Sequence, residues 1–185
     1  DVDTDTLAYY RFDESEGTVA EDSSFSGAWD GTLMNGAGRS TNTPSGAAGK
    51  TLLLDGIDDY VSISPDLLNS RTQGTVEVDA FIDSLDPVGG APLVSKGNTA
   101  TNDFVLSVSP TGTLVAHMGT GLYLESVATI TTGVWVHVAV TWDGTEWRLY
   151  INDTLAAQTN TAAIPINDAV EPVKIGRHNH SAGPF

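Results

Sequence analysis

Short runs in which hydrophobic and polar residues alternate fill most of this sequence, and clusters of Gly, Asn, Asp, Ser and Pro separate them. A period of two places successive side chains on opposite faces of a β-strand, and no stretch shows the 3.6-residue period of an amphipathic helix. The pattern therefore predicts a series of strands, with long surface loops at 13–50 and 160–171. The predicted strands are Thr6–Phe12, Thr51–Leu54, Tyr60–Ile63, Thr75–Ile82, Pro92–Lys96, Phe104–Ser109, Thr113–Met118, Leu122–Val127, Val134–Trp142, Glu146–Ile151, Thr154–Thr159 and Val173–Gly176.

Strands at this spacing, without helices, are typical of an all-β protein. We predict a two-sheet antiparallel β-sandwich, or jelly roll, that forms one domain over residues 1–185, because 185 residues suit a single sandwich. The chain contains no cysteine, and it is long enough to bury a core without disulfides.

The most specific local prediction concerns the hairpin around Asp143-Gly144. This dipeptide tolerates the positive φ angles of a type I′ turn, so the flanking runs should pair and bring Trp142 and Trp147 together. The run before the turn is apolar on both faces except at His137, and it therefore predicts a central strand. We expect His137 to be buried and bonded to a neighbouring carbonyl rather than to act in catalysis.

The charge balance restricts the partners. The chain carries 24 acidic and 8 basic residues, for a formal net charge of −16. Such a surface repels nucleic acid and anionic membranes and attracts divalent cations. No apolar run reaches the length that membrane insertion requires.

Five segments, in order, resemble the laminin G-like jelly-roll family of the concanavalin A-like lectin/glucanase superfamily. They are LAYYRFDESEG (7–17), AEDSSFSGAWDGTL (20–33), GKTLLLDGIDDYVSI (49–63), TGVWVHVAVTWDG with WRLYIND (132–153) and VKIGR (173–177). The resemblance implies a secreted or cell-surface protein with a binding or adhesion role. The motif at Asp55–Tyr60 is expected to be a structural turn, with a ligand or metal site at Asp58 or Asp59 as the alternative.

The resemblance also implies that the family's last strand is absent, because the chain stops at Phe185 soon after the Ile-Gly motif. The strand predicted around Leu7–Phe12 should then be under-covered and its backbone edge unpaired. Three explanations follow: a longer natural chain, a rearranged edge, or a strand donated by another copy, which would make the protein self-associate.

Related glycoside hydrolases carry a Glu-x-Asp-x-Glu strand whose acids act as nucleophile and general acid. Here Glu77 and Asp79 share a strand face, but Phe81 takes the position of the second glutamate. A carboxylate two residues further on would lie roughly 6–7 Å too far along the strand. We therefore predict that the protein is not an enzyme and that Glu77 and Asp79 are solvent-side residues.

The acidic surplus and the Asp- and Asn-rich loops favour a bound Ca²⁺, which takes six to eight oxygen ligands. The resemblance places candidate ligands at Asp13 and Asp22. A fainter similarity to pentraxins adds Asn102 and Asp103. The alternative is that these side chains only cap turns.

We predict a non-catalytic extracellular binding or adhesion module whose partner is a glycan or an extracellular protein, with calcium-assisted carbohydrate binding favoured. Sugars bind by ring stacking and hydrogen bonding, which makes Trp29, Asn102 and Tyr123 candidate contacts. For Trp29, covering an open end of the core is the alternative. The net charge should disfavour anionic glycans unless calcium bridges them. Two other functions remain open: a structural subunit with strand exchange, and a divergent glycan-cleaving enzyme.

Overall fold

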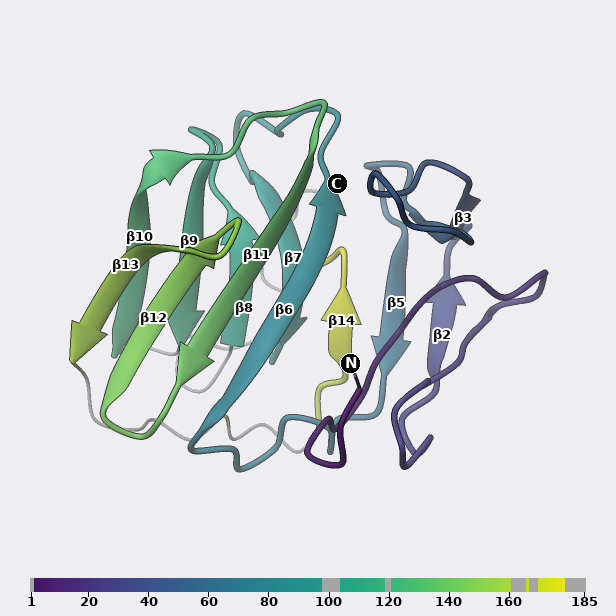
Figure 1. The fold of residues 1–185 in the computed structure, drawn as a ribbon, viewed down its shortest axis with the longest axis horizontal. Coiled ribbons are helices and arrows are strands. Elements are labelled where there is room, and N and C mark those ends of the chain that lie inside the picture. Colours follow the sequence, from purple (N-terminus) through teal and green to yellow (C-terminus); the bar gives the residue numbers. More distant parts are fainter. Residues whose placement is uncertain (1, 98–103, 119–120, 161–165, 167–169, 179–185) are drawn as a thin grey trace.

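A computed structural model describes residues 2–97, 104–118, 121–160, 166 and 170–178. Within these residues it contains strands and no helix, and two larger antiparallel sheets face each other (Figure 1). The predicted all-β, two-sheet antiparallel sandwich is therefore confirmed. No helix in the described part of the chain is available to span a membrane.

The strands form three sheets. The eight-stranded sheet has the order β1 (Val19–Ala20), β2 (Gly31–Met34), β5 (Tyr60–Ile63), β14 (Val173–Ile175), β7 (Ala91–Lys96), β8 (Phe104–Val108), β9 (Thr113–Met118) and β10 (Leu122–Thr129). The four-stranded sheet has the order β13 (Thr154–Asn160), β12 (Glu146–Ile151), β11 (Trp135–Trp142) and β6 (Gly74–Phe81). A small sheet pairs β3 (Gly38–Ser40) with β4 (Thr51–Leu53).

The core lies between the two larger sheets and consists of the side chains that point inward at every second position of their strands. On β11 the side chains of Val136, Val138 and Val140 are buried, whereas the residues that alternate with them are mostly half-buried on the outer face. Trp142 and Trp147 stack across the β11–β12 hairpin with ring centroids 5.1 Å apart, as predicted. These buried rings join the four-stranded sheet to the core of the eight-stranded one.

The turn chemistry differs from the prediction in one detail. In the β11–β12 hairpin only Gly144 has a positive φ, so the turn at Asp143-Gly144 is not type I′. The Asp143 carboxylate caps a longer loop instead, accepting the N–H groups of Thr145 and Glu146. The Thr145 hydroxyl also donates to this carboxylate and is the main cause that lowers the pKa of Asp143, and the two backbone bonds add to it. The two-residue turn with both φ angles positive lies at Asn152 and Asp153, between β12 and β13.

Two predictions about the first fifty residues are wrong. The segment 13–50, expected to be a loop, contains β1, β2 and β3, whose two to four residues are too short to show alternation in the sequence. The segment Thr6–Phe12, expected to be a strand, has only an isolated bridge between Tyr10 and Asp22. Its apolar side chains alternate: Leu7 and Tyr9 are 40% and 43% exposed, whereas Ala8, Tyr10 and Phe12 pack against the core. The absence of the family's last strand stays a prediction.

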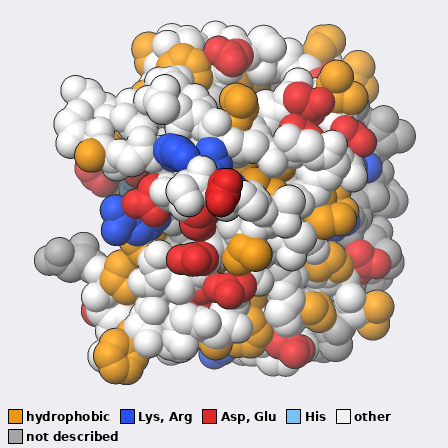
Figure 2. Space-filling view, turned by 90° about the vertical axis from the view of Figure 1, so that its right-hand side faces the viewer, with side chains coloured by type: hydrophobic (Ala, Val, Ile, Leu, Met, Phe, Trp, Pro, Cys, Tyr) orange, Lys and Arg blue, Asp and Glu red, His pale blue; other side chains and the backbone are white. Residues whose placement is uncertain are grey.

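The N-terminal segment crosses in front of β5 and β2 of the eight-stranded sheet, to one side of β6 (Figure 1). Among the described residues β6 pairs only with β11, so it is an edge strand of the four-stranded sheet. Figure 2 shows the side of the molecule that lies nearest β2 and β3 in Figure 1, where acidic side chains lie next to a small group of basic ones. An eight-residue edge strand and an extended segment thus lie close together without pairing.

Candidate functional site

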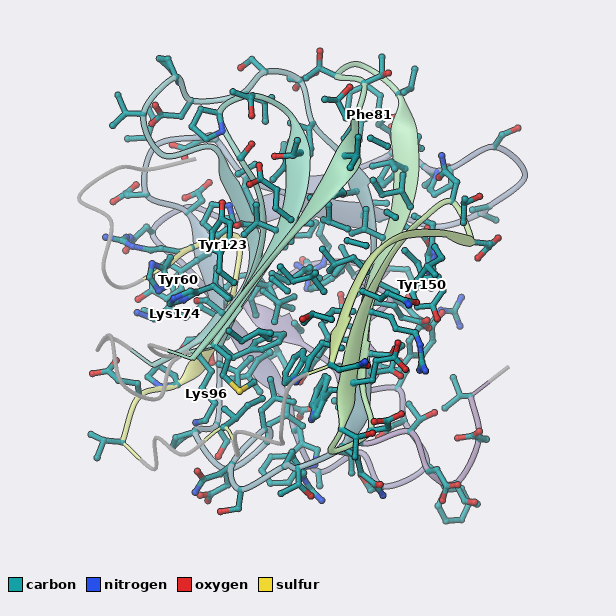
Figure 3. The ribbon with its side chains drawn as sticks, turned by 90° about the vertical axis from the view of Figure 1, so that its left-hand side faces the viewer. Tyr60, Phe81, Lys96, Tyr123, Tyr150 and Lys174 are labelled. Atoms are coloured by element: carbon teal, nitrogen blue, oxygen red, sulfur yellow. The ribbon has the colours of Figure 1, made fainter. Side chains whose placement is uncertain are left out.

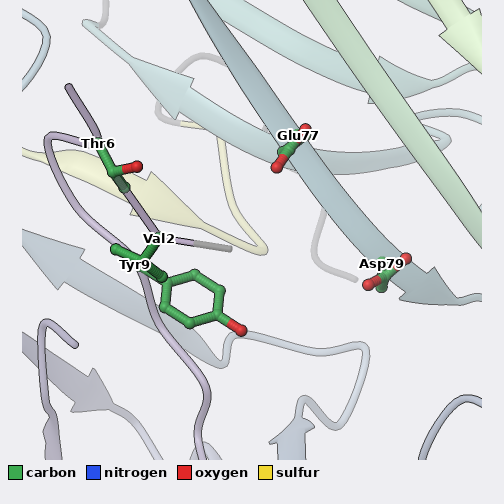
Figure 4. Close-up of a pocket in the computed structure, with 5 residues that line it drawn as sticks. All are labelled: Val2, Thr6, Tyr9, Glu77 and Asp79. Atoms are coloured by element: carbon green, nitrogen blue, oxygen red, sulfur yellow. The ribbon is translucent and has the colours of Figure 1, made fainter. Parts of the chain in front are cut away.

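A cavity of about 500 Å³ lies between the N-terminal segment and β6 (Figure 4). Val2, Thr6 and Tyr9 line it from one side, and Glu77 and Asp79 from the other. The space is open to solvent, because Tyr9 and Glu77 beside it are exposed. We call this space the β6 cavity.

The alternation of β6 explains why two carboxylates face the cavity. Val76 and Val78 pack against the core, so Glu77 and Asp79 project from the outer face of the sheet and are exposed. The Glu77 side chain is 68% exposed. This agrees with the predicted solvent-side location, and the geometry adds that the carboxylates face a second wall of protein.

His137 lies beside these carboxylates on the neighbouring strand, opposite Asp79 in the β6–β11 register. Its Nε2 is 3.8 Å from Oε2 of Glu77, and its Nδ1 is 3.7 Å from Oδ1 of Asp153. The prediction of a buried, carbonyl-bonded histidine is wrong: the side chain is 33% exposed, and within the described residues its Nδ1 makes no hydrogen bond. The ring is therefore half-buried on the outer face of the sheet, with its Nδ1 enclosed by neighbouring atoms.

The other wall depends on hydrogen bonds within the first thirty residues. The N–H of Tyr9 donates to Oδ1 of Asp22 at 3.0 Å. The hydroxyl of Thr6 donates to Oδ1 of Asp3 at 3.0 Å, and this bond is the main cause that lowers the pKa of Asp3. The backbone of Tyr9 is therefore held in place by Asp22, and the residue is 43% exposed beside the cavity.

Asp22, a predicted calcium ligand, is almost fully buried, and its carboxylate accepts four hydrogen bonds. The donors are the N–H groups of Tyr9, Ser24 and Trp29 and the Ser24 hydroxyl, at 2.9 to 3.1 Å. Burial by itself would raise the pKa of Asp22, but the bonds from Ser24 and Tyr9 outweigh it and lower the pKa. These contacts match the turn-capping alternative. Asp13, the other candidate ligand here, forms an ion pair of 2.9 Å with Arg11.

The predicted ligand contacts lie elsewhere. Trp29 is half-buried and packs against the core, as the cover alternative implies. Tyr123 is 63% exposed on β10, and its hydroxyl donates to Glu125. Figure 3 shows Tyr123 on the opposite side of the molecule from Phe81 and Tyr150, which belong to the four-stranded sheet. Asn102 and Asp103 lie outside the described residues.

Sequence reasoning missed the β6 cavity because its two walls are separated by nearly seventy residues of chain. The alternation that exposes Glu77 and Asp79 was visible, but nothing in the sequence indicated that Tyr9 would lie opposite them. The only available signal was the expectation of an uncovered edge near Leu7–Phe12.

A second group of carboxylates lies in the Asp55–Tyr60 turn. Carboxylate oxygens of Asp55, Asp58 and Asp59 lie within 4.8 Å of one another. Asp55 accepts the N–H groups of Ile57 and Asp58, and Asp59 accepts the N–H of Asp55. The bond from Ile57 is the main cause that lowers the pKa of Asp55. These bonds support the predicted structural turn. The oxygen-only donor set also suits a hard cation, although three carboxylates are fewer ligands than calcium requires.

The family model Laminin_G_3, described as the concanavalin A-like lectin/glucanases superfamily, matches residues 55–185. Among solved structures, domain 4 of AbnA, a GH43 extracellular arabinanase from Geobacillus stearothermophilus, in complex with arabinotriose, is similar with a TM-score of 0.73. The identity is 19%, over 97% of this chain and 86% of that one. The Ruminococcus gnavus IT-sialidase CBM40 bound to α2,3-sialyllactose has a TM-score of 0.51 and 21% identity, over 61% of this chain and 70% of that one. At these identities the likeness establishes the fold. A comparison with curated proteins found no match.

Proposed function

The chain belongs to the Laminin_G_3 family of the concanavalin A-like lectin/glucanases superfamily, and from this premise we propose that it is a non-catalytic carbohydrate-binding module of an extracellular or cell-surface protein. The similar arabinanase domain is bound to arabinotriose, and the similar sialidase CBM40 is bound to sialyllactose. We extend to this chain only the property of binding a glycan.

The β6 cavity carries the proposal. Glu77 and Asp79 offer carboxylate oxygens that accept sugar hydroxyls, and Tyr9 offers an exposed ring beside them. Carboxylates that accept hydrogen bonds, together with an aromatic ring that packs on a sugar face, are what glycan recognition requires. Because both charged groups are negative, the ligand should be an uncharged sugar, in agreement with the expectation from the net charge.

Binding without catalysis is favoured by the same strand. Glu77 and Asp79 are followed on that face by Phe81, so the second glutamate of a Glu-x-Asp-x-Glu hydrolase strand is missing. In that arrangement the two glutamates are the nucleophile and the general acid, and here the place of the second glutamate is taken by Phe81, with the next carboxylate, Asp83, a further two residues along the strand.

We propose in addition that Ca²⁺ assists the domain, as its acidic loops suggest. If so, 5 mM calcium should raise the melting temperature above that measured in EDTA, because an ion that binds only the folded state stabilises it. Equal melting temperatures in calcium and EDTA would exclude a stabilising calcium site.

The test of glycan binding is an array of neutral and acidic glycans, followed by calorimetry of each bound glycan with Glu77→Gln and Asp79→Asn. We expect neutral glycans to bind and each variant to weaken binding about tenfold, since one hydrogen bond to a charged group contributes about 1.5 kcal/mol or more. Glu125→Gln, at an exposed carboxylate on β10, is the matched control and should leave affinity unchanged. A bound glycan whose affinity ignores all three substitutions would place the site elsewhere.

One alternative function has an observation in its favour. One edge of β6 is paired with no other described strand, and it could receive a strand from another copy, which would make the protein a subunit of an assembly. Light scattering distinguishes this from the module: a monomer at all concentrations excludes strand exchange between copies.

A further inference from the structure

The outer face of the four-stranded sheet continues beyond the β6 cavity as an ordered set of side chains. On β6 they alternate along one face, and on β11 their register partners stand beside them. The β6 members are Glu77, Asp79 and Phe81, and their partners are Ala139, His137 and Trp135. Polar groups therefore occupy the middle of this face, and two aromatic rings occupy its end.

The Phe81 and Trp135 rings form a pair with centroids 5.7 Å apart and planes inclined by 58°. Both side chains are half-buried, and neither belongs to the core between the sheets. The Trp135 Nε1–H donates to Oδ1 of Asn42 at 3.2 Å, which fixes the indole in place. A fixed, partly exposed aromatic pair outside the core is a surface on which a sugar ring can stack.

The spacing sets the length of the ligand. At a strand rise of about 3.4 Å per residue, Phe81 lies about 7 Å beyond Asp79 and about 14 Å beyond Glu77. A monosaccharide bound between the carboxylates and Tyr9 does not reach the rings. A chain of linked sugars does, because it can follow β6 along its outer face.

We infer that the β6 cavity is one end of an extended binding track whose other end is the Phe81–Trp135 pair, and that its ligand is a linear, uncharged oligosaccharide of about three or more units. This inference rests on the proposed glycan binding and adds the ligand class. Glu77 and Asp79 hold sugar hydroxyls at one end, and the aromatic pair stacks on a later unit. His137 lies beside Asp79 on the neighbouring strand.

The experiment is calorimetry with arabinan, xylan, cellulose and mannan oligosaccharides of increasing length, starting from the monosaccharide. Affinity should rise with each unit until the chain spans the track and then stay constant. Phe81→Ala should weaken binding of the longer chains about tenfold and leave the disaccharide affinity unchanged, while Phe81→Tyr, which keeps the ring, should restore it. Trp135→Phe is a second variant of the aromatic pair, and it removes less side-chain volume than Phe81→Ala.

Each outcome has a definite meaning. Affinity that is independent of chain length would overturn the track and leave the proposed function intact. A loss in Phe81→Ala that is equal for all lengths, together with a lower melting temperature, would show that Phe81 only supports the structure and would also overturn it. Failure to bind any glycan, both in these series and on the array, would overturn the proposed function itself.

Discussion

Replacement of Asp22 by Asn should destabilise the protein and disorder one wall of the β6 cavity. The buried carboxylate accepts four hydrogen bonds, two on each oxygen, from Tyr9, Ser24 and Trp29. Asn keeps one acceptor oxygen and puts an NH₂ group where the other oxygen accepts two bonds, so donors then face donors. The shape of the side chain stays the same, and the change therefore reports on hydrogen bonding and charge.

The magnitude follows from the two lost bonds. Net contributions of hydrogen bonds to charged groups are about 1.5 to 3 kcal/mol each, and solvent can replace part of this at Ser24, so we expect the free energy of unfolding to fall by about 3 kcal/mol. For a domain of this size the melting temperature should fall by about 6–12 °C. The control Asp66→Asn removes an exposed carboxylate and should change the free energy by less than about 0.5 kcal/mol.

The effect should depend on pH in a defined direction. The pKa of Asp22 is lowered in the folded state, so its contribution is fully present above the ordinary carboxyl pKa and is lost as the pH falls through the lowered value. The gap between wild type and Asp22→Asn, measured by urea unfolding, should be largest near pH 7 and close in strong acid. Melting of Asp22→Asn within about 2 °C of Asp66→Asn at pH 7 would refute this account of the Asp22 network.

Two further substitutions probe the frame around the site. Gly90→Ala should reduce stability by several kcal/mol, because a Cβ there would lie 2.2 Å from the Val108 carbonyl oxygen. Gly46→Ala is the control, because Gly46 has a similar positive φ but no atom within 4 Å of an added Cβ. Equal falls in the melting temperatures of the two variants would contradict the steric argument. Arg39→Met should cost about 3–5 kcal/mol in urea unfolding, because it leaves the largely buried Glu14 carboxylate without its ion-pair partner. The double variant with Glu14→Leu should recover part of that loss, and no recovery would argue against charge burial as the cause.

The sequence by itself determined the elements whose partners are close in the chain. The β11–β12 hairpin and the Trp142–Trp147 stack follow from alternation and an adjacent turn signal, because local pairing needs no information from distant residues. The alternation of β6 likewise put Glu77 and Asp79 on one face and showed that Phe81 interrupts the acidic series. Even here the turn geometry at Asp143 was wrong, since side-chain capping decided it.

Only the tertiary structure decided what lies opposite these side chains. The sequence around Tyr9 predicts a strand, yet in the described residues this segment makes a single bridge. A strand forms only when the edge of another strand is within hydrogen-bonding distance, and the β6 cavity separates this segment from β6. The Phe81–Trp135 pair likewise joins two strands that are far apart in the chain. A period of two tells which face a residue occupies, but the groups brought to that face from distant segments are set by the packing of the whole chain.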